Sequence, residues 1–236
     1  MEEISNNLLR ILVTGSNGQL GSEIRAIAEK YPQLHFIFTD VDELDITDKN
    51  SLASFFKNSK PNFVINCAAY TAVDGAEDDK YNAFRINAEA PKLLAEASKV
   101  VGAKLIHIST DYVFNGRTWE PYTEDYPTSA NSVYGESKLQ GEKWVLESGN
   151  AMVIRTSWLY SNYGNNFVKT IARKGQTTDF LRVVYDQVGT PTWGHDLAKA
   201  IIDIIVQSPK NFVSEIFHYS NEGVCSWYDF AIEIVS

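Results

Sequence analysis

Short apolar, β-branched runs alternate along the chain with amphipathic stretches of about ten residues or more. The apolar runs predict strands within residues 8–15, 34–40, 61–69, 103–114 and 151–160. The stretches between them predict helices within residues 19–30, 50–58, 81–102 and 132–148. Continuous apolar strands that alternate with helices are typical of βαβ units with right-handed crossovers. The pattern therefore predicts an α/β fold with a Rossmann-type, doubly wound parallel sheet.

Beyond Tyr160 the alternation of strand and helix patterns becomes less regular, and we expect a smaller C-terminal lobe. The segment LRVVYDQVGTPTW (181–193) contains a strand-like run, and a helix is expected to start near His195. EIFHYSN (215–221) reads as another strand, and SWYDFAIEIVS (226–236) as the start of a helix. The chain stops inside this last pattern without a Gly or Asn cap, so we expect a truncated C-terminus.

A glycine-rich turn follows the first predicted strand. VTGSNGQLG (13–21) places Gly15, Gly18 and Gly21 between a strand and a helix. Glycine permits a tight turn and a close approach of the backbone to a pyrophosphate, and the helix N-terminus supplies free N–H groups for the anion. This strand–turn–helix context favours a dinucleotide site over a βα turn that uses glycine only for its shape.

Acidic residues follow the second predicted strand. Asp40 stands nineteen residues after Gly21, where a carboxylate can accept hydrogen bonds from the adenosine ribose and repels a 2′-phosphate. This position favours NADH over NADPH, although a turn-forming Asp is the structural alternative. The DITD segment (45–48) is expected to cap the next helix, and it also lies beside adenine in Rossmann proteins with short crossovers.

Candidate chemistry gathers after the fourth predicted strand. Ser109, Thr110 and Asp111 end this strand, and ligands bind at the carboxyl ends of parallel strands. Tyr134 and Lys138 follow at helical i, i+4 spacing, which puts a phenol and an ammonium on one face. A chance register is the alternative for this pair. The convergence of a hydroxyl, a phenol and an ammonium favours proton transfer.

Composition excludes several classes of function. The net charge is −9, with 21 basic and 30 acidic residues, which argues against a nucleic-acid partner. No run of 18 apolar residues occurs, so we expect no membrane span. The two cysteines, Cys67 and Cys225, suit a reducing cytosol and give no metal-ligand spacing. We therefore expect a cytoplasmic protein without a metal site.

Several motifs together carry a family resemblance. They are NCAAYTAVDGAE (66–77), STDYVFNG (109–116), YGESKLQGE (134–142), IRTSWLY (154–160) and VVYDQVGTPT (183–192). Across residues 10–236 they resemble the dTDP-4-dehydrorhamnose reductases, in the extended short-chain dehydrogenase/reductase superfamily. The resemblance implies a dinucleotide-binding Rossmann core in residues 1–160. Residues 161–236 would form a partial sugar-nucleotide lobe interleaved with that core.

The resemblance also implies roles for single residues. Tyr134 would donate a proton to the C4 alkoxide of dTDP-4-dehydro-L-rhamnose. Lys138 would lower the pKa of Tyr134 and hold the nicotinamide ribose, and Thr110 would hydrogen-bond the oxyanion. Asp111 and Trp158 would contact the sugar, with core packing as the alternative for Trp158. The remaining cofactor contacts would come from Gly15, Gly18, Gln19, Leu20, Asp40, Asp45, Ile46, Ala69, Tyr70 and Thr71.

The resemblance leaves some alternatives open. The family is usually described with NADPH and some members accept NADH, so with Asp40 in place we expect the use of both cofactors. A homodimer is a candidate assembly. An epimerase or dehydratase of the same superfamily is one alternative activity, but the Asp111-Tyr112 pair after Thr110 fits a reductase better than the Asp-Glu of a dehydratase. A non-catalytic, dinucleotide-binding regulatory subunit is the other.

Overall fold

The computed structural model describes residues 8–207 and 212–236, and its centre is a six-stranded sheet. The strands are β1 (Leu9–Thr14), β2 (Leu34–Thr39), β3 (Phe63–Asn66), β4 (Lys104–Thr110), β5 (Ala151–Thr156) and β9 (Ile216–His218). Their order is β2-β1-β3-β4-β5-β9, and every neighbouring pair is parallel. The predicted doubly wound parallel sheet is confirmed. Its switch point lies between β1 and β3, where ligands of such sheets bind.

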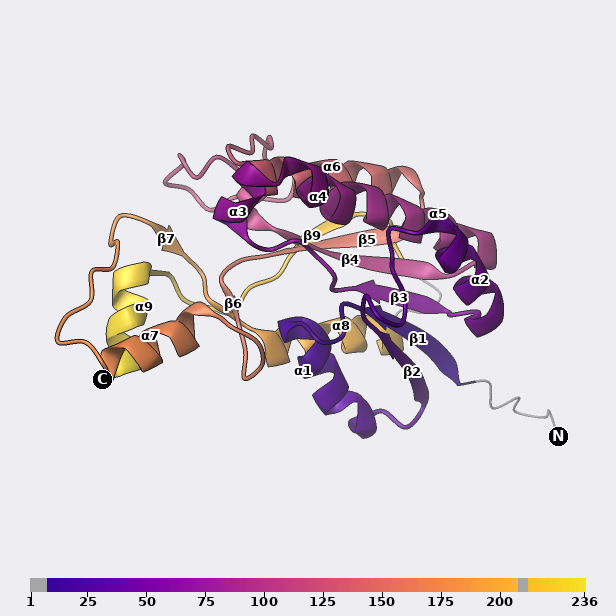
Figure 1. The fold of residues 1–236 in the computed structure, drawn as a ribbon, viewed down its shortest axis with the longest axis horizontal. Coiled ribbons are helices and arrows are strands. Elements are labelled where there is room, and N and C mark those ends of the chain that lie inside the picture. Colours follow the sequence, from indigo (N-terminus) through magenta and orange to yellow (C-terminus); the bar gives the residue numbers. More distant parts are fainter. Residues whose placement is uncertain (1–7, 208–211) are drawn as a thin grey trace.

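Helices cover both faces of the sheet (Figure 1). One face carries α1 (Gln19–Ile27), which ends in a 3₁₀ turn (Ala28–Lys30), and α8 (Gly194–Gln207). The other carries α2 (Lys49–Ser59), α5 (Ala90–Val101) and α6 (Val133–Glu147). Each face buries its own apolar cluster: residues such as Ile11, Ile24 and Ile201 on the first, and Leu12, Phe56, Leu94 and Val145 on the second. Each face of the sheet therefore packs on its helices through a buried apolar cluster.

The predicted helix 81–102 is not one continuous α-helix. It consists of α4 (Lys80–Phe84), a π-helical turn (Arg85–Glu89) and α5, and the unpredicted helix α3 (Val73–Asp78) precedes it. The turn contains Asn87, whose amide accepts from the backbone N–H of Tyr70 at 2.8 Å and donates to its carbonyl at 3.0 Å. The same amide donates to Ser137 on α6 at 3.0 Å. A π turn of this kind is frequent near functional sites.

The segment after β5 forms a lobe beside the carboxyl edge of the sheet (Figure 1). Its elements are β6 (Leu159–Tyr160), α7 (Phe167–Gly175), β7 (Val188–Gly189), β8 (Thr192–Trp193), β10 (Cys225–Ser226) and α9 (Trp227–Val235). β7 pairs with β10 and β6 with β8. Between β8 and β10 the chain returns to the core, where it forms α8 and β9.

Two details of this lobe differ from the sequence prediction. The segment 181–193, which was expected to contain a strand-like run, holds only the two-residue strands β7 and β8, and residues 181–187 form no strand. Helix α7 was not predicted, although Asn166 caps it by accepting from the N–H of Lys169 at 3.0 Å. The predicted helices near His195 and within 226–236 are confirmed as α8 and α9.

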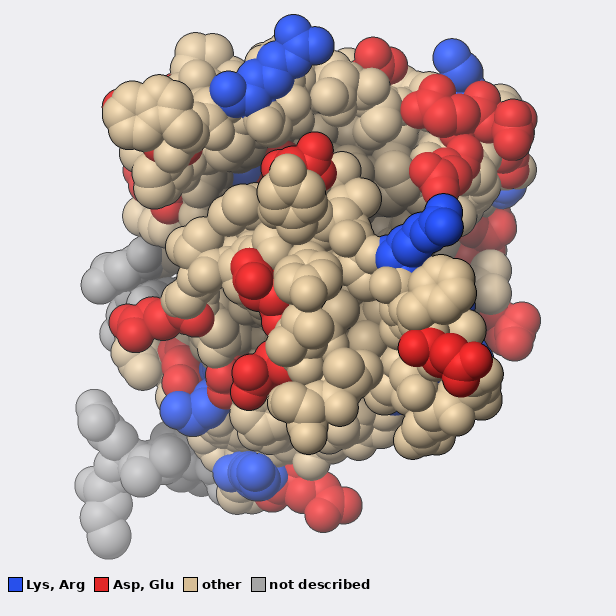
Figure 2. All heavy atoms as spheres, turned by 90° about the vertical axis from the view of Figure 1, so that its left-hand side faces the viewer, with Lys and Arg blue, Asp and Glu red and all other residues tan. Residues whose placement is uncertain are grey.

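The face that the lobe presents is broad and largely uncharged, with acidic side chains scattered over it in small groups (Figure 2). Apolar residues of the lobe contribute to the exposed surface: Phe180, Val184, Tyr185, Val188, Tyr228, Ile232 and Val235. Among the described residues, no helix combines the length and apolar character that a membrane crossing needs.

Candidate functional site

The glycine-rich loop between β1 and α1 has a geometry that requires glycine. Gly15 has φ +64°, and a Cβ on it would lie 2.5 Å from the backbone nitrogen of Ala68. A Cβ on Gly21 would lie 2.5 Å from the Cα of Ser16, so α1 packs directly on the loop. Gly18 precedes α1 without a side-chain cap, which leaves N–H groups of the first turn for an anion. These residues fit a pyrophosphate.

The carboxylate of Asp40 holds the glycine-rich loop against the end of β2. One oxygen accepts from the backbone N–H of Asn17 and the other from that of Val41, each at 2.9 Å. Ser16 reinforces the junction by donating its backbone N–H to the carbonyl of Thr39 at 3.1 Å. Asp40 is therefore both a turn-forming residue and a negative charge at the predicted ribose position.

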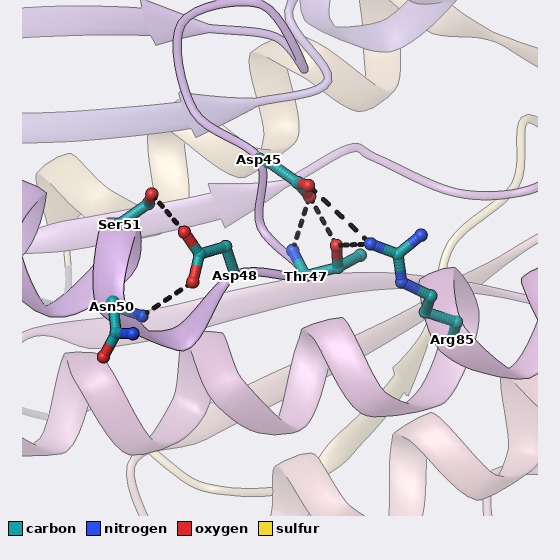
Figure 3. Close-up of polar contacts among 6 residues, drawn as sticks. All are labelled: Asp45, Thr47, Asp48, Asn50, Ser51 and Arg85. Carbon is teal, nitrogen blue, oxygen red and sulfur yellow. Dashed lines mark hydrogen bonds and ion pairs between the residues drawn. The ribbon is translucent and has the colours of Figure 1, made fainter.

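The DITD segment forms a polar cluster with Arg85 (Figure 3). Asp45 accepts from the backbone N–H and the hydroxyl of Thr47, at 2.8 and 2.6 Å, and these bonds lower the pKa of Asp45, with a smaller effect from Arg85. Arg85 lies 3.8 Å from Asp45 and donates to the Thr47 hydroxyl at 2.5 Å. Asp48 caps α2 by accepting from Asn50, as predicted.

A cavity of about 1060 Å³ runs along the carboxyl edge of the sheet into the lobe. It brings together almost all of the predicted site residues: Gly15, Gly18, Gln19, Leu20, Asp40, Asp45, Ile46, Ala69, Thr71, Thr110, Asp111, Tyr134, Lys138 and Trp158. The exception is Tyr70, whose ring packs against a separate cluster of Ala76, Ala83 and Val133. Its backbone is hydrogen-bonded to the side chain of Asn87, so Tyr70 is held next to the cavity without lining it.

The predicted catalytic residues come from β4 and α6. Ser132 caps α6 by accepting from the N–H of Gly135 at 3.1 Å, which places Tyr134 in the first turn and Lys138 one turn later. Lys138 is 2% exposed and donates from Nζ to the carbonyl of Ile108 at 2.7 Å. Thr110 ends β4 and donates from its hydroxyl to Asp111 at 3.1 Å. The phenol, the ammonium and the hydroxyl all line the cavity.

The pKa of Tyr134 is raised to about 12, so the sequence-based expectation of a lowered pKa is wrong. Burial is the main cause, because it disfavours the phenolate. The charge of Asp111 adds to this effect, whereas the neighbouring Thr110 side chain opposes it. Tyr134 is therefore protonated at neutral pH, the form in which it can serve as a proton donor.

Burial shifts the pKa values of two other ionisable groups of the cavity in the direction that favours their neutral forms. The pKa of Lys138 falls to about 8, although Glu142 and Cys67 raise it somewhat. The pKa of Asp111 rises to about 6, and its hydrogen bond from Thr110 acts against this rise. Such shifts in one cavity are typical of sites that move protons.

An aromatic wall closes the lobe side of the cavity. Trp158 has φ +47°, a strained conformation for a residue with a side chain, and its indole stacks on Trp227 with the ring centroids 3.5 Å apart. Phe167 packs against Trp227 at a centroid distance of 4.4 Å. Trp158 therefore packs in the lobe and also lines the cavity, and its predicted contact with the sugar stays a prediction.

Sequence reasoning missed several lining residues: Thr47, Arg85, Ser157, Phe167 and Trp227. Thr47 lies within the DITD segment that the sequence analysis singled out. Trp227 and Phe167 reach the cavity only through the packing of α7 against α9. Within the described ranges, no group of three or more His, Cys, Asp or Glu side chains is arranged to hold a metal ion.

Comparisons with known proteins agree with this geometry. The chain is 40% identical over 230 residues to the spore coat polysaccharide biosynthesis protein SpsK of Bacillus subtilis, covering 97% of this chain and 79% of that protein. A dTDP-4-dehydrorhamnose reductase structure from Clostridium acetobutylicum superposes with a TM-score of 0.90 and 49% identity, covering 95% of this chain and 79% of that one.

A second solved structure is that of the dTDP-4-dehydrorhamnose reductase of Bacillus anthracis in complex with NADP. It has a TM-score of 0.89 and 40% identity, again covering 95% of this chain and 79% of that one. The family model described as the RmlD substrate binding domain matches residues 9–236. The resemblance drawn from the motifs is confirmed, and the chain belongs to the RmlD substrate binding domain family, that of the dTDP-4-dehydrorhamnose reductases.

Proposed function

We propose that this chain reduces the C4 ketone of dTDP-4-dehydro-L-rhamnose to dTDP-L-rhamnose, with NADPH or NADH as the reductant. The observation that carries the proposal is the single cavity that joins the glycine-rich loop to Thr110, Tyr134 and Lys138. The relatives that share this fold at 40% identity or more include named reductases of this substrate.

The residues present fit a dinucleotide along the whole cavity. The loop from Gly15 to Gly18 would take the pyrophosphate, because a Cβ on Gly15 would clash with the backbone of Ala68 and because α1 begins after Gly18 without a side-chain cap, which leaves N–H groups of its first turn for the anion. Asp45 and Ile46 would hold the adenosine half. Lys138 would hold the nicotinamide ribose at the other end. A bound reduced nicotinamide supplies the hydride for the ketone carbon.

The protein's own part in the reaction would be proton transfer and orientation. As the carbonyl oxygen gains negative charge, Tyr134 would donate its phenolic proton to it, since an alkoxide is a stronger base than a phenolate. Thr110 would turn its hydroxyl from Asp111 to the same oxygen. The ammonium of Lys138 would stabilise the phenolate left on Tyr134 until a proton returns from solvent.

The lobe would hold the sugar nucleotide. Asp111 lies beside Thr110 at the proposed reacting end, and Trp158 and Trp227 add stacked aromatic rings to the lining of the same cavity. Aromatic faces suit the apolar face of a deoxysugar or a pyrimidine base. We propose that Asp111 accepts a sugar hydroxyl and that Trp158 contacts the sugar.

The reaction can be tested by following reduced-nicotinamide absorbance with dTDP-4-dehydro-L-rhamnose, for the wild type and Tyr134→Phe. The wild type is expected to oxidise the cofactor, and the variant to lose about two to four orders of magnitude in kcat while still binding NADPH. Cofactor binding without ketone-dependent oxidation would overturn the reductase proposal in favour of a regulatory binder. A product that retains its oxidation level would indicate an epimerase or dehydratase.

We also propose a cytoplasmic location and a homodimer. Two free cysteines suit a reducing compartment. Exposed apolar residues of the lobe, among them Phe180, Tyr185 and Ile232, offer a surface that a second copy could cover. Sedimentation velocity across a concentration series tests the dimer, and a single monomeric species at all concentrations would contradict it.

A further inference from the structure

A buried ion pair begins one helical turn along α6 from the proposed catalytic lysine. Glu142 on α6 and Arg155 on β5 are 1% and 4% exposed. Arg155 donates from Nε to one carboxylate oxygen at 2.9 Å and from Nη2 to the other at 2.7 Å. This is a two-pronged contact in which each carboxylate oxygen accepts one guanidinium N–H. Glu142 is therefore fixed in position as the carboxylate partner of the Arg155 guanidinium.

Glu142 stands one helical turn after Lys138, so the two side chains share a face of α6. Lys138, Glu142 and Arg155 are three of the few buried charged side chains among the described residues. They form one alternating series: ammonium, carboxylate, guanidinium. Because burial penalises each charge, a series of this kind persists only when neighbouring charges compensate one another.

We propose that Glu142 and Arg155 are positioning residues for the proposed reductase reaction. Glu142 keeps the Lys138 ammonium protonated and directed at the cavity. Arg155 holds Glu142 in place and partly offsets the effect of its negative charge on Lys138. This inference rests on the proposed function of Lys138. Neither residue lines the cavity, so neither touches substrate or cofactor.

The other ionisable groups around Lys138 do not supply the balancing charge. Burial raises the pKa of Cys67 to about 12 and depresses that of His107, so both are neutral between pH 7 and 9. Tyr134 is also protonated in this range. Asp111 is ionised there, but its carboxylate accepts the Thr110 hydroxyl at the cavity. Glu142 is left as the anion behind the ammonium, and it opposes the effect of burial on the Lys138 pKa.

Arg155 also ties this series to two distant segments. Its Nη1 donates to the carbonyl of Glu124 at 3.4 Å and lies 3.5 Å from Nε2 of His218 on β9. Glu124 in turn accepts the backbone N–H of His218 at 3.0 Å. The guanidinium lies over the ring of Phe114 at 5.1 Å. These contacts hold the side chain of Arg155 from several sides, which makes the position of Glu142 rigid.

Because Glu142 and Arg155 carry opposite charges, removing one or the other should shift the pKa of Lys138 in opposite directions. Glu142→Gln removes the anion and leaves an unpaired guanidinium, so Lys138 should lose its proton at lower pH. Arg155→Met leaves Glu142 without its counter-ion, so Lys138 should keep its proton to higher pH. We expect shifts of about one pH unit in opposite directions. The double variant should fall between the wild type and Glu142→Gln.

The test follows the pH dependence of NADPH affinity, by quenching of tryptophan fluorescence from pH 6.5 to 10, together with kcat/KM over the same range. Both should decline above the Lys138 pKa. Glu136→Gln is the matched control, because it removes the same charge from an exposed position of α6, and its profile should coincide with that of the wild type. Binding profiles need no turnover, so they decide the inference even if the wild type reduces no ketone.

Single-variant profiles that coincide with the wild type, or that move in the same direction, would overturn the inference even if kcat fell. If Glu142→Gln does not fold, the pH profiles of Glu142→Asp and of the double variant test the inference instead. The aspartate should retain the wild-type profile and the double variant should move to lower pH. An aspartate profile displaced as far as that of the double variant would overturn the role of the carboxylate.

Discussion

Asp45 and Arg85 come from separate segments and meet at the end of the cavity proposed for the adenosine, with Thr47 between them (Figure 3). The carboxylate and the guanidinium are 3.8 Å apart, and their side chains are 44% and 39% exposed. An ion pair this exposed contributes little to stability by itself. Its consequence is local, because Arg85 holds the turn that would present Asp45 to the adenine.

Arg85→Leu should therefore weaken the binding of NADH and NADPH to the same extent, by about threefold, as expected for an exposed pair. Fluorescence titration with each dinucleotide measures the effect. Lys80→Leu is the control, since Lys80 is exposed on the neighbouring helix and does not line the cavity. A loss confined to NADPH would show instead that Arg85 binds the 2′-phosphate.

Asp40 should govern the choice between the two cofactors. Its carboxylate carries a full negative charge at the predicted ribose position, and an amide of the same shape would not repel a 2′-phosphate. Asp40→Asn should raise the affinity ratio of NADPH over NADH by about tenfold, or 1.4 kcal/mol. Because Asp40 also accepts the N–H groups of Asn17 and Val41, both affinities should fall somewhat. An unchanged ratio would assign Asp40 to the turn alone.

The sequence predicted the sheet because buried parallel strands contain continuous apolar runs, and β1, β3 and β5 each contain such a run of three or more residues. It also predicted the positions of Thr110, Tyr134 and Lys138, because strand ends and helical spacing determine which side chains meet. These properties depend on residues close together in sequence.

What the sequence did not predict depends on contacts between distant segments. The π turn at Asn87 is built around bonds to Tyr70 and Ser137, and no local pattern marks it. Residues 181–187 have strand propensity, but the ladder with β10 includes only Val188 and Gly189. The raised pKa of Tyr134 arises from burial by the whole fold, whereas the expectation of a lowered pKa considered only its neighbour Lys138.

Asp111 should make the folded protein less stable as the pH rises. Its folded-state pKa of about 6 lies above the ordinary value of 3.8, so folding favours the protonated form. The stabilisation is present at acid pH and is lost as the pH rises from about 4 to about 6. Asp111→Asn lacks this titration, so its Tm relative to the wild type should increase over that interval. Other carboxylates, including Asp45 and Glu124, titrate in both proteins and cancel in the comparison.

Thermal unfolding of the two proteins, followed by circular dichroism at pH 4, 5, 6, 7 and 8, measures this difference. The asparagine preserves the acceptor for the Thr110 hydroxyl, so the comparison isolates the charge. Curves that run parallel across the whole pH range would show that Asp111 titrates normally in the folded state.

Gly189 should control the position of Trp158 and with it the fit of the sugar nucleotide. A Cβ at Gly189 would lie 2.6 Å from Cε2 of Trp158, whose indole is already stacked on Trp227. Gly189→Ala therefore forces the indole out of its place, and overpacking of this kind costs about 1–3 kcal/mol. We expect KM for the sugar nucleotide to rise about tenfold or more, while the Kd for NADPH is unchanged. Val188→Ala, at an exposed position of the same strand, should leave both constants as they are. An equal loss of cofactor affinity in Gly189→Ala would mean that the aromatic wall supports the whole cavity, and Trp158 would then lose its proposed role as a sugar contact.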